Sequence, residues 1–417
     1  MPSSPPNAMK WASAVSTHPS LELALREVIE RVLTQLEMAP NLAIIFISSA
    51  FASEYSRVLP LLKGPLGGAH IVGCSGGGVI GRSNTGELIE VEETAGISLT
   101  VAYLPDVNIQ GFHLSIDELP DLDSPPSEWT EIIGVSPAEK PHFLLMADPF
   151  ASGMNDLLQG LDFAYPESVK VGGLAGIESI SRSCGLFCGQ QLYRQGVVGV
   201  ALSGNIVIDA IVAQGCRPIG PTFRVVEGDR NVVTKVAAQA SQDEADTQTP
   251  LEALQELFQD LDETDRQLAQ ESLFIGLAQS SFKQALGQGD FLIRNLVGVD
   301  PKVGAIAIAD RIRPGQRIQF HLRDAHTAKD DLVALLKTYR LDNQERSAPS
   351  GALLFACNGR GTSLFDTPNC DTKQFSRQLG PVPLGGFFCN GEIGPVGNTT
   401  FLHGFTSVFG ICRELDK

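Results

Sequence analysis

The sequence predicts an α+β fold (mixed α/β) with internally duplicated strand–helix–strand units, added β-hairpins and two halves packed together. Two recurring patterns favour this class. In the first, an apolar strand precedes a helical or mixed segment and a second strand that runs into glycines. In the second, a turn joins two alternating strands. The chain has 417 residues, 43% of them hydrophobic, which is enough for two or three domains with sizeable cores.

The first expected element is an amphipathic helix from Ser20 to Met38. Its apolar residues repeat at helical spacing, Ser20 can cap it, and Pro40 ends it. The residues up to Met9 are expected to be a frayed tail. We therefore assign residues 1–40 to an N-terminal tail and helix.

The strand–helix–strand pattern occurs three times, at residues 42–78, 142–176 and 352–388. Its strands are continuous runs of Val, Ile, Leu and Phe, which are typical of strands covered on both faces. A helix between two such strands makes a parallel crossover the expected connection.

The strand–turn–strand pattern also occurs three times, at residues 96–114, 197–212 and 303–322. Turn-forming residues such as Pro, Asp, Asn and Gly separate two alternating strands in each copy. This combination is typical of β-hairpins, and we expect one at each place.

Residues 240–272 fit neither pattern. They are acidic, with ten Asp and Glu against one Arg between residues 241 and 271. Thr249 and Glu252 match a capping box with Pro250 at the first helical position. One apolar face follows, made of Leu251, Leu254, Leu257, Phe258 and Leu261. We expect an acidic surface helix, with a docking helix for a partner as the alternative.

Charge and hydropathy exclude several classes of function. The net charge is −17 and Lys and Arg form no dense run, which argues against a nucleic-acid partner or an anionic-membrane surface. No apolar run reaches the ~18 residues of a transmembrane helix. The eight cysteines are scattered, and a chain with its own core needs no disulfides. We therefore expect a soluble cytoplasmic protein without membrane insertion.

Two glycine motifs near Ser75 match signatures of other protein classes. Residues 76–81 fit a dinucleotide-binding motif and residues 73–77 fit a nucleophile elbow. Both motifs require a helix after the glycines, whereas residues 82–86 have the chemistry of a turn. We therefore assign no cofactor and no catalytic residue here.

Cys184 and Cys188 have short metal-like spacing, but no second Cys or His pair lies near them in the sequence. Alternation along a strand places both sulfurs on one face. We expect two core cysteines and assign no metal site.

Two turns near the C-terminus hold the densest group of polar residues. Cys357–Gly361 ends one buried strand and Phe387–Gly394 ends another, and α/β proteins build pockets beyond such strand ends. Arg360 can clamp a carboxylate, and Glu392 can receive an ammonium or hydroxyl group. Alternatively, Arg360 and Glu392 pair with each other and hold the two turns together.

These residues also carry a resemblance to a known family. Val72–Gly78 and Val171–Gly176 resemble the two glycine signatures of the N-terminal part of the FIST (F-box and intracellular signal transduction) family. Cys357–Gly361, Leu384–Glu392 and His403–Thr406 resemble its C-terminal part. The resemblance implies a FIST N-terminal domain at residues 41–225 and a FIST C-terminal domain at residues 226–412.

The resemblance further implies a sensory domain of intracellular signal transduction that binds small ligands such as amino acids. Because the two parts account for the length of the chain, we expect output through a separate signalling protein. The predicted ligand site combines residues of both parts: Cys357, Asn358, Arg360, Gly361, Phe387, Phe388, Asn390 and Glu392, with Ser75 and Gly172.

Two other classes of function stay open at this point. One is a hydrolase or transferase that uses Cys357 or Cys389 as its nucleophile. The other is a protein-interaction scaffold that binds no ligand. The first would show a single fast-reacting thiol, and the second would depend on the acidic segment.

Overall fold

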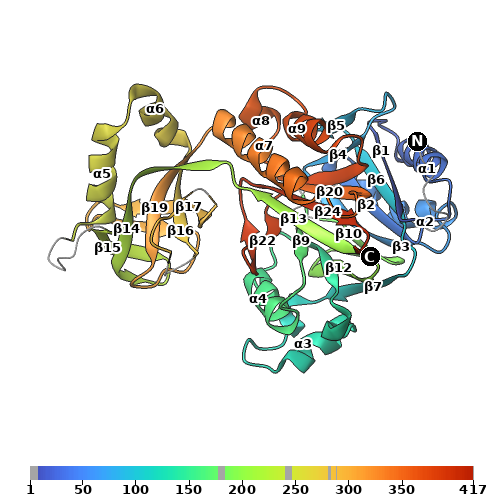
Figure 1. Cartoon of the computed structure of the whole chain (residues 1–417), viewed down its shortest axis with the longest axis horizontal. Helices are drawn as coiled ribbons and strands as arrows, with labels where there is room; N and C mark the ends of the chain where they lie inside the picture. Colours follow the sequence, from blue (N-terminus) through green and yellow to red (C-terminus); the bar gives the residue numbers. More distant parts are fainter. Residues whose placement is uncertain (1–7, 177–183, 240–246, 280–282, 288, 417) are drawn as a thin grey trace. The chain divides into compact units, whose positions relative to one another are not determined.

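The computed structural model describes residues 8–176, 184–239, 247–279, 283–287 and 289–416. The chain divides into two compact units (Figure 1). Unit 1 comprises Met1–Ala213 and Leu332–Lys417, and unit 2 comprises Gln214–Asp331. Unit 2 is therefore inserted into the sequence of unit 1. Helices and several mixed sheets confirm the predicted α+β class.

Unit 1 contains three six-stranded sheets of the same design. The first sheet has the order β1 (Lys10–Ser16), β6 (Ile97–Tyr103), β2 (Leu42–Ser48), β3 (His70–Gly76), β10 (Leu186–Cys188) and β11 (Gln191–Tyr193). The second has the order β7 (Val107–Leu114), β12 (Val197–Gly204), β8 (His142–Ala147), β9 (Lys170–Leu174), β22 (Glu392–Val396) and β23 (Thr399–His403). The third has the order β13 (Val207–Ala213), β24 (Ser407–Arg413), β20 (Gly351–Cys357), β21 (Leu384–Cys389), β4 (Gly78–Arg82) and β5 (Leu88–Val91).

A parallel strand pair lies at the centre of each sheet, and these pairs are the three predicted crossovers. β2 pairs with β3, β8 with β9, and β20 with β21, all in parallel. The helices of unit 1 are α1 (Leu21–Leu36), α2 (Tyr55–Lys63), α3 (Pro126–Ile133), α4 (Met154–Ala164), α8 (Thr362–Phe365), α9 (Cys370–Leu379) and most of α7 (Ala325–Asp342). The repeated pattern in the sequence thus marks three modules, and the crossover prediction is confirmed.

Each module donates a hairpin to the sheet of another module. The hairpin β4–β5 follows β3 in the chain but pairs with β21 of the third sheet. The hairpin β22–β23 follows β21 but pairs with β9 of the second sheet. The hairpin β10–β11 follows β9 but pairs with β3 of the first sheet. The exchange is cyclic, so every sheet of unit 1 contains strands from two modules.

The three hairpins predicted from the second pattern are wrong. β6 pairs with β1 and β2, whereas β7 pairs with β12 in another sheet. β12 and β13 likewise belong to different sheets. The short turns after residues 103 and 204 therefore connect the last strand of one module to the first strand of the next. Alternation and turn chemistry define two strands and a turn, but they do not define the partner of either strand.

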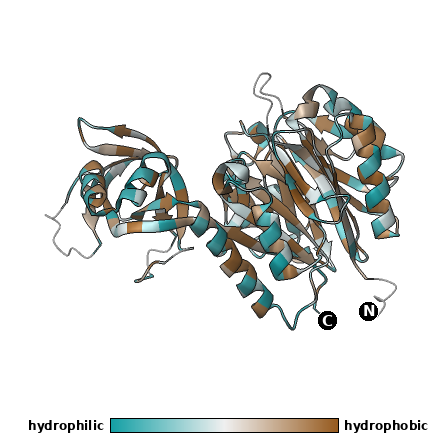
Figure 2. Ribbon diagram, turned by 90° about the horizontal axis from the view of Figure 1, so that it is seen from above, coloured by the Kyte–Doolittle hydropathy of each residue, from teal (hydrophilic) through white to brown (hydrophobic). Residues whose placement is uncertain are grey.

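A central and three outer apolar cores stabilise the described part of unit 1. A central core receives side chains from all three sheets, including Phe46, Leu144 and Phe355. Three outer cores lie between a sheet and its own helices, namely α1 and α2, α3 and α4, and α7 and α9. Figure 2 shows the apolar residues along the strands and the mixed composition of the helices. Burying one large apolar side chain contributes ~1.5–3 kcal/mol, so the central core binds the three modules strongly.

One glycine recurs at the same place in each parallel pair. A Cβ on Gly73 or Gly172 would lie 1.8 Å from the carbonyl oxygen of Ile45 or Leu145 on the neighbouring strand. A Cβ on Gly386 would lie 2.0 Å from the Leu354 oxygen. These glycines allow the two strand backbones to pair closely, which explains part of the glycine signatures.

The N-terminal segment contains one strand that the sequence analysis missed. β1 pairs antiparallel with β6, and Trp11 is buried in the central core. The amphipathic helix is confirmed as α1, although the Ser20 side chain makes no capping hydrogen bond. The expected tail falls mostly on residues 1–7, outside the described residues. Within the described ranges, no helix is both long enough and apolar enough to cross a membrane.

In the described residues, unit 2 is a closed six-stranded barrel with the helices α5 (Pro250–Asp260) and α6 (Glu263–Glu271) and the start of α7. Its strand order is β14 (Cys216–Asp229), β15 (Val232–Ala238), β18 (Ala305–Ile308), β17 (Phe291–Asp300), β16 (Leu273–Ala278) and β19 (Arg317–Arg323). β18 and β19 are not neighbours, so the third predicted hairpin is wrong as well. The acidic segment forms α5 and α6, and the capping box of Thr249 and Glu252 is confirmed. Leu254 and Leu257 are buried, as expected for the apolar face.

Candidate functional site

The carboxyl ends of β3, β9 and β21 meet in unit 1. Three backbone hydrogen bonds connect them in a ring: Gly77 N to Phe388 O at 2.8 Å, Gly176 N to Ser75 O at 2.8 Å, and Asn390 N to Leu174 O at 3.1 Å. Each module therefore donates one of these bonds and accepts another. We call residues 75–77, 174–176 and 388–390 the junction. Ligands of α/β proteins commonly bind beyond the carboxyl ends of strands.

Ser75 is a structural residue of the junction. Its Oγ donates to Gly176 O at 2.6 Å and accepts from Gly185 N at 2.9 Å, and the side chain is fully buried. The glycines after Ser75 lead directly into the strand β4. The helix that a nucleophile elbow or a dinucleotide site requires does not follow them.

Two asparagine side chains link the ends of β20, β21 and β9 at the surface. Asn358 Nδ2 donates to Asn390 Oδ1 at 2.8 Å, and Asn390 Nδ2 donates to Ala175 O at 2.8 Å. Asn358 N also donates to Cys389 O at 2.9 Å. Both asparagines are exposed. Both residues therefore present amide groups where solvent reaches the surface beside the junction.

A buried ion pair lies two residues beyond Asn358. Arg360 Nε and Nη2 donate to the two carboxylate oxygens of Asp371 at 2.8 and 2.9 Å, in bidentate geometry. Arg360 is 0% exposed, and Ser407 Oγ donates to the same carboxylate. The ion-pair partner of Arg360 is thus Asp371 rather than Glu392, which corrects the pairing considered from the sequence. Arg360 Nη1 has no hydrogen-bond partner among the described residues.

Glu392 is buried two residues beyond Asn390. Its Oε2 accepts from Thr406 N at 3.0 Å, and its Oε1 accepts from Cys389 Sγ at 3.4 Å. Burial raises the pKa of Glu392 to about 8, although these hydrogen bonds and Arg360 act in the opposite direction. The side chain is therefore mostly protonated at neutral pH.

A second buried glutamate lies next to the ion pair. Glu90 Oε1 accepts from Thr372 N at 2.8 Å, and its Oε2 has no hydrogen-bond partner among the described residues. Burial and the charge of Asp371 raise the pKa of Glu90 to about 8. We call Glu90, Arg360, Asp371 and Glu392 the polar layer.

Cys389 lies against the polar layer and is buried. Burial, followed by the charge of Glu392, raises the pKa of Cys389 well above its usual value. Its Sγ also donates to Ala356 O at 3.2 Å. A protonated, enclosed thiol is a poor nucleophile, which counts against Cys389 as a catalytic residue.

The structure brings seven of the predicted site residues to the junction, to the turn beside it or to the polar layer. These are Ser75, Cys357, Asn358, Arg360, Phe388, Asn390 and Glu392. Gly361 lies beside them with φ +65, and a Cβ there would be 2.3 Å from Glu92 Oε2. Thr362 N donates to both oxygens of Glu92, so Gly361 allows this close contact at the start of α8.

Two phenylalanine side chains and Gly172 contribute to cores and strand pairing. Phe387 stacks on Phe46 with ring centroids 4.7 Å apart in the central core, and Phe388 lies in the outer core of the third sheet. Gly172 faces the neighbouring strand β8. The sequence analysis missed Glu90 and Asp371, because neither belongs to a recognisable motif. Only the position of Asp371 in the first turn of a helix distinguishes it.

Cys184 and Cys188 are core cysteines, as expected. Cys184 belongs to the central core and Cys188 packs against it. Their sulfurs donate to the carbonyl oxygens of Arg194 and Phe112 at 3.3 and 3.5 Å. Burial raises the pKa of both thiols, to about 12 for Cys184.

These features define a class of protein: three hairpin-exchanging α/β modules, interrupted by a barrel, that meet above a buried polar layer. Models of known families identify it further. The FIST N domain matches residues 41–239 and the FIST C domain matches residues 250–395. The chain belongs to the FIST family, whose domains are associated with sensing in signal transduction.

Two of the curated relatives are uncharacterized mycobacterial proteins. An uncharacterized protein of Mycobacterium tuberculosis is 31% identical over 96% of this chain and 98% of its own length. Another, from Mycobacterium bovis, is 36% identical over 63% of this chain and 65% of its own length. A solved cyanuric acid hydrolase from A. caulinodans covers 97% of this chain and 99% of its own, with 9% identity. Its TM-score of 0.30 is too low to support an argument.

Proposed function

We propose that this protein is an intracellular sensor that binds a small, amino-acid-like molecule over the junction. The observation that carries the proposal is the position of two exposed amides, Asn358 and Asn390, next to the buried polar layer. Asparagine amides offer donors and acceptors that suit both a carboxylate and an ammonium group. Buried ionisable groups with shifted pKa values also concentrate at functional sites.

In this proposal, Arg360 and Glu392 position the binding residues and do not touch the ligand. Both side chains are fully buried, and Arg360 is held by Asp371. Asn390 links the third module to the second through Ala175 O, and Asn358 donates to Asn390, so a ligand bound to these amides favours one arrangement of the strand ends. A separate signalling protein in the cytoplasm then reads the change in population.

The test is a thermal-shift screen of the purified chain against amino acids and related metabolites. We expect at least one compound to raise the Tm of the wild type, and the shift to vanish in the double variant Asn358→Ala/Asn390→Ala. Asn398→Ala alters another exposed asparagine and should keep the full shift. A shift that survives in the double variant, or a screen with no response, would contradict the proposal.

The alternative of a cysteine-dependent hydrolase or transferase is tested by thiol labelling. We expect Cys389 to react slowly with iodoacetamide at pH 7, because its pKa is raised. One cysteine that reacts much faster than the unfolded protein's thiols would favour the enzyme and disfavour a sensor.

A further inference from the structure

Two cavities adjoin at the amino ends of the parallel strands, far from the junction. β3 begins at His70 and reaches the junction at Ser75, a span of about 17 Å at the usual rise of a strand. The cavities share two lining residues, Gly68 and His70. No atom lies within 4 Å of an ideal Cβ on Gly68, so the space at this shared boundary is open.

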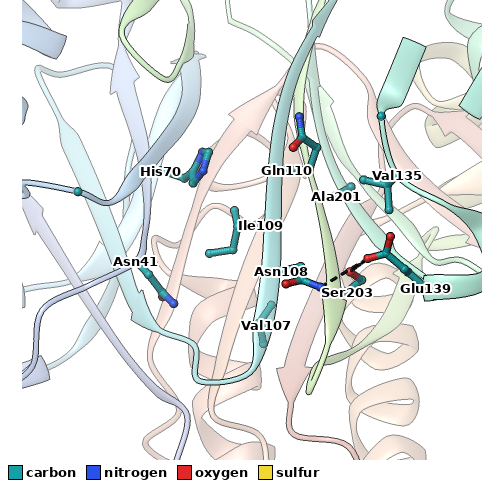
Figure 3. Close-up of a pocket in the computed structure, with 12 residues that line it drawn as sticks. Asn41, His70, Val107, Asn108, Ile109, Gln110, Val135, Glu139, Ala201 and Ser203 are labelled. Carbon is teal, nitrogen blue, oxygen red and sulfur yellow. Dashed lines mark hydrogen bonds between the residues drawn. The ribbon is translucent and has the colours of Figure 1, made fainter. Parts of the chain in front are cut away.

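The first cavity, of about 470 Å³, is polar (Figure 3). It lies between the first sheet, which contributes His70, and the second sheet, which contributes Asn108, Gln110 and Ser203. Glu139 comes from the short 3₁₀ helix that precedes β8. It is the only Asp, Glu, Lys or Arg among the described residues that line this cavity.

The carboxylate of Glu139 is held in place by neutral donors. Its Oε2 accepts from Ser203 Oγ at 3.0 Å and from Asn108 Nδ2 at 3.5 Å, as the dashed lines in Figure 3 mark. A carboxylate has about four acceptor positions, so these two bonds leave room for further donors. The first cavity therefore offers one oriented negative charge with amide and hydroxyl groups around it.

The second cavity, of about 690 Å³, is lined largely by apolar groups. They come from the end of α2, from residues 66–71 and from the turn between β10 and β11. Leu59, Leu66 and Ile71 form part of its wall. Lys63 also lines this cavity, and its ammonium group donates to Gln190 Oε1 at 3.0 Å.

We infer that the two cavities form one amphipathic site for a small molecule with an apolar chain or ring and a primary amine head. The head binds Glu139 in the polar cavity, and the apolar part passes His70 into the second cavity. A charged hydrogen bond from an ammonium to a carboxylate is stronger than a neutral one, and the apolar wall stabilises a hydrocarbon. The inference concerns a site distinct from the junction and does not depend on the sensor proposal.

Titration calorimetry with n-octylamine as the probe tests the inference. Octanoate, which has the same length and the opposite charge, and ethanolamine, which has the same head and a minimal tail, serve as comparison probes. We expect octylamine to bind with an affinity at least about tenfold higher than either of them. Equal binding of octylamine and octanoate would overturn the assignment of the head to Glu139. Equal binding of octylamine and ethanolamine would overturn the assignment of the tail.

Variants locate the binding site. Glu139→Gln should weaken octylamine binding about tenfold, whereas Glu131→Gln, a change at an exposed position in α3, should leave it unchanged. Ala69→Trp fills the apolar cavity and should abolish binding. If this variant has a lowered Tm, Gln190→Trp at the rim replaces it. Octylamine binding that persists in both Glu139→Gln and the filled variant would overturn the inference. Asn358→Ala/Asn390→Ala should bind octylamine normally, which separates this site from the junction.

Discussion

At the scale of single residues, the polar layer is unusual because it encloses three carboxyl groups and one guanidinium. Asp371 neutralises Arg360, while Glu90 and Glu392 avoid unpaired charges by remaining protonated. The layer is therefore close to electrically neutral at pH 7, as a buried group of this kind must be. Glu90 comes to the layer from a distant part of the chain, since its Oε1 accepts from Thr372 N, 282 residues away.

Removing the partner of Arg360 should be strongly destabilising. Asp371→Asn leaves a buried guanidinium without its counter-charge, and we expect a loss of about 3–5 kcal/mol in the free energy of unfolding. Urea denaturation followed by circular dichroism measures the loss. The matched change Asp366→Asn, at an exposed position in the same segment, should cost less than about 0.5 kcal/mol. A loss below about 1 kcal/mol for Asp371→Asn would show that solvent reaches Arg360.

Stability should fall between about pH 6.5 and pH 8. The pKa values of Glu90 and Glu392 are about 8 in the folded protein, above the usual 4.5, so folding retains protons that the unfolded chain releases. Below pH 6.5 two effects on the free energy of unfolding oppose each other. Burial lowers the pKa of His142 and His321 to about 4, so their contribution to stability rises with pH while that of the two glutamates falls. Well above pH 8 both glutamates are ionised in the folded and in the unfolded protein, so they no longer make stability depend on pH.

Glu392→Gln isolates one half of this effect. The neutral amide cannot ionise, so the decline between pH 6.5 and 8 should shrink by roughly half, as measured by urea unfolding at each pH. Glu87→Gln changes an exposed glutamate and should preserve the wild-type slope. A wild-type protein whose stability rises over this interval would refute the assignment of raised pKa values.

At the scale of elements, we expect the same loss of stability when the equivalent glycine of any of the three parallel strand pairs is replaced. Gly73→Ala, Gly172→Ala and Gly386→Ala each place a methyl group within about 2 Å of a carbonyl oxygen on the next strand. We expect a destabilisation of about 3 kcal/mol or more, because backbone has to move. Gly64→Ala, with φ −67 and open space around its Cβ, should be nearly neutral. Thermal unfolding of the four variants checks both outcomes.

The elements also show what the sequence could and could not predict. The three crossovers and α1 were predictable because local periodicity and turn residues determine them. The hairpin exchange was not, because the partner of β4 or β22 lies in another module. β1 was missed because Ala and Ser interrupt its apolar pattern. At the candidate site, the sequence predicted the residues at the strand ends. Asp371 and Glu90 could be assigned to the site only once the fold showed their contacts with Arg360 and Thr372.

At the scale of the whole molecule, the third module is split in the sequence. β13 precedes the barrel, whereas β20, β21 and β24 follow it. The domain boundary expected near residue 225 lies within β14, inside unit 2, and the division into two FIST parts there remains a prediction. The compact units are thus divided at other residues than the family domains, which match residues 41–239 and 250–395.

Unit 1 should fold without the barrel. Cys216 pairs with Arg323 across β14 and β19, so the two strands that enter and leave the barrel lie side by side. Replacing residues 217–322 with a short Gly-Ser turn should give a protein that unfolds cooperatively, with the junction intact. Circular dichroism measures whether the shortened chain unfolds cooperatively, and a retained ligand response shows that its junction is intact. A non-cooperative or insoluble product would mean that the barrel contributes to the stability of unit 1.

The cyclic exchange of hairpins has a consequence for synthesis on the ribosome. The second sheet lacks β22 and β23 until residue 403 has been made, and the third sheet lacks its central strands for almost as long. Early modules therefore expose unpaired strand edges while translation continues, and such edges promote aggregation. This architecture makes completion of the chain, rather than of any one module, the event that commits the protein to its native state. Nascent chains stalled before residue 384 should accordingly remain sensitive to protease and dependent on chaperones.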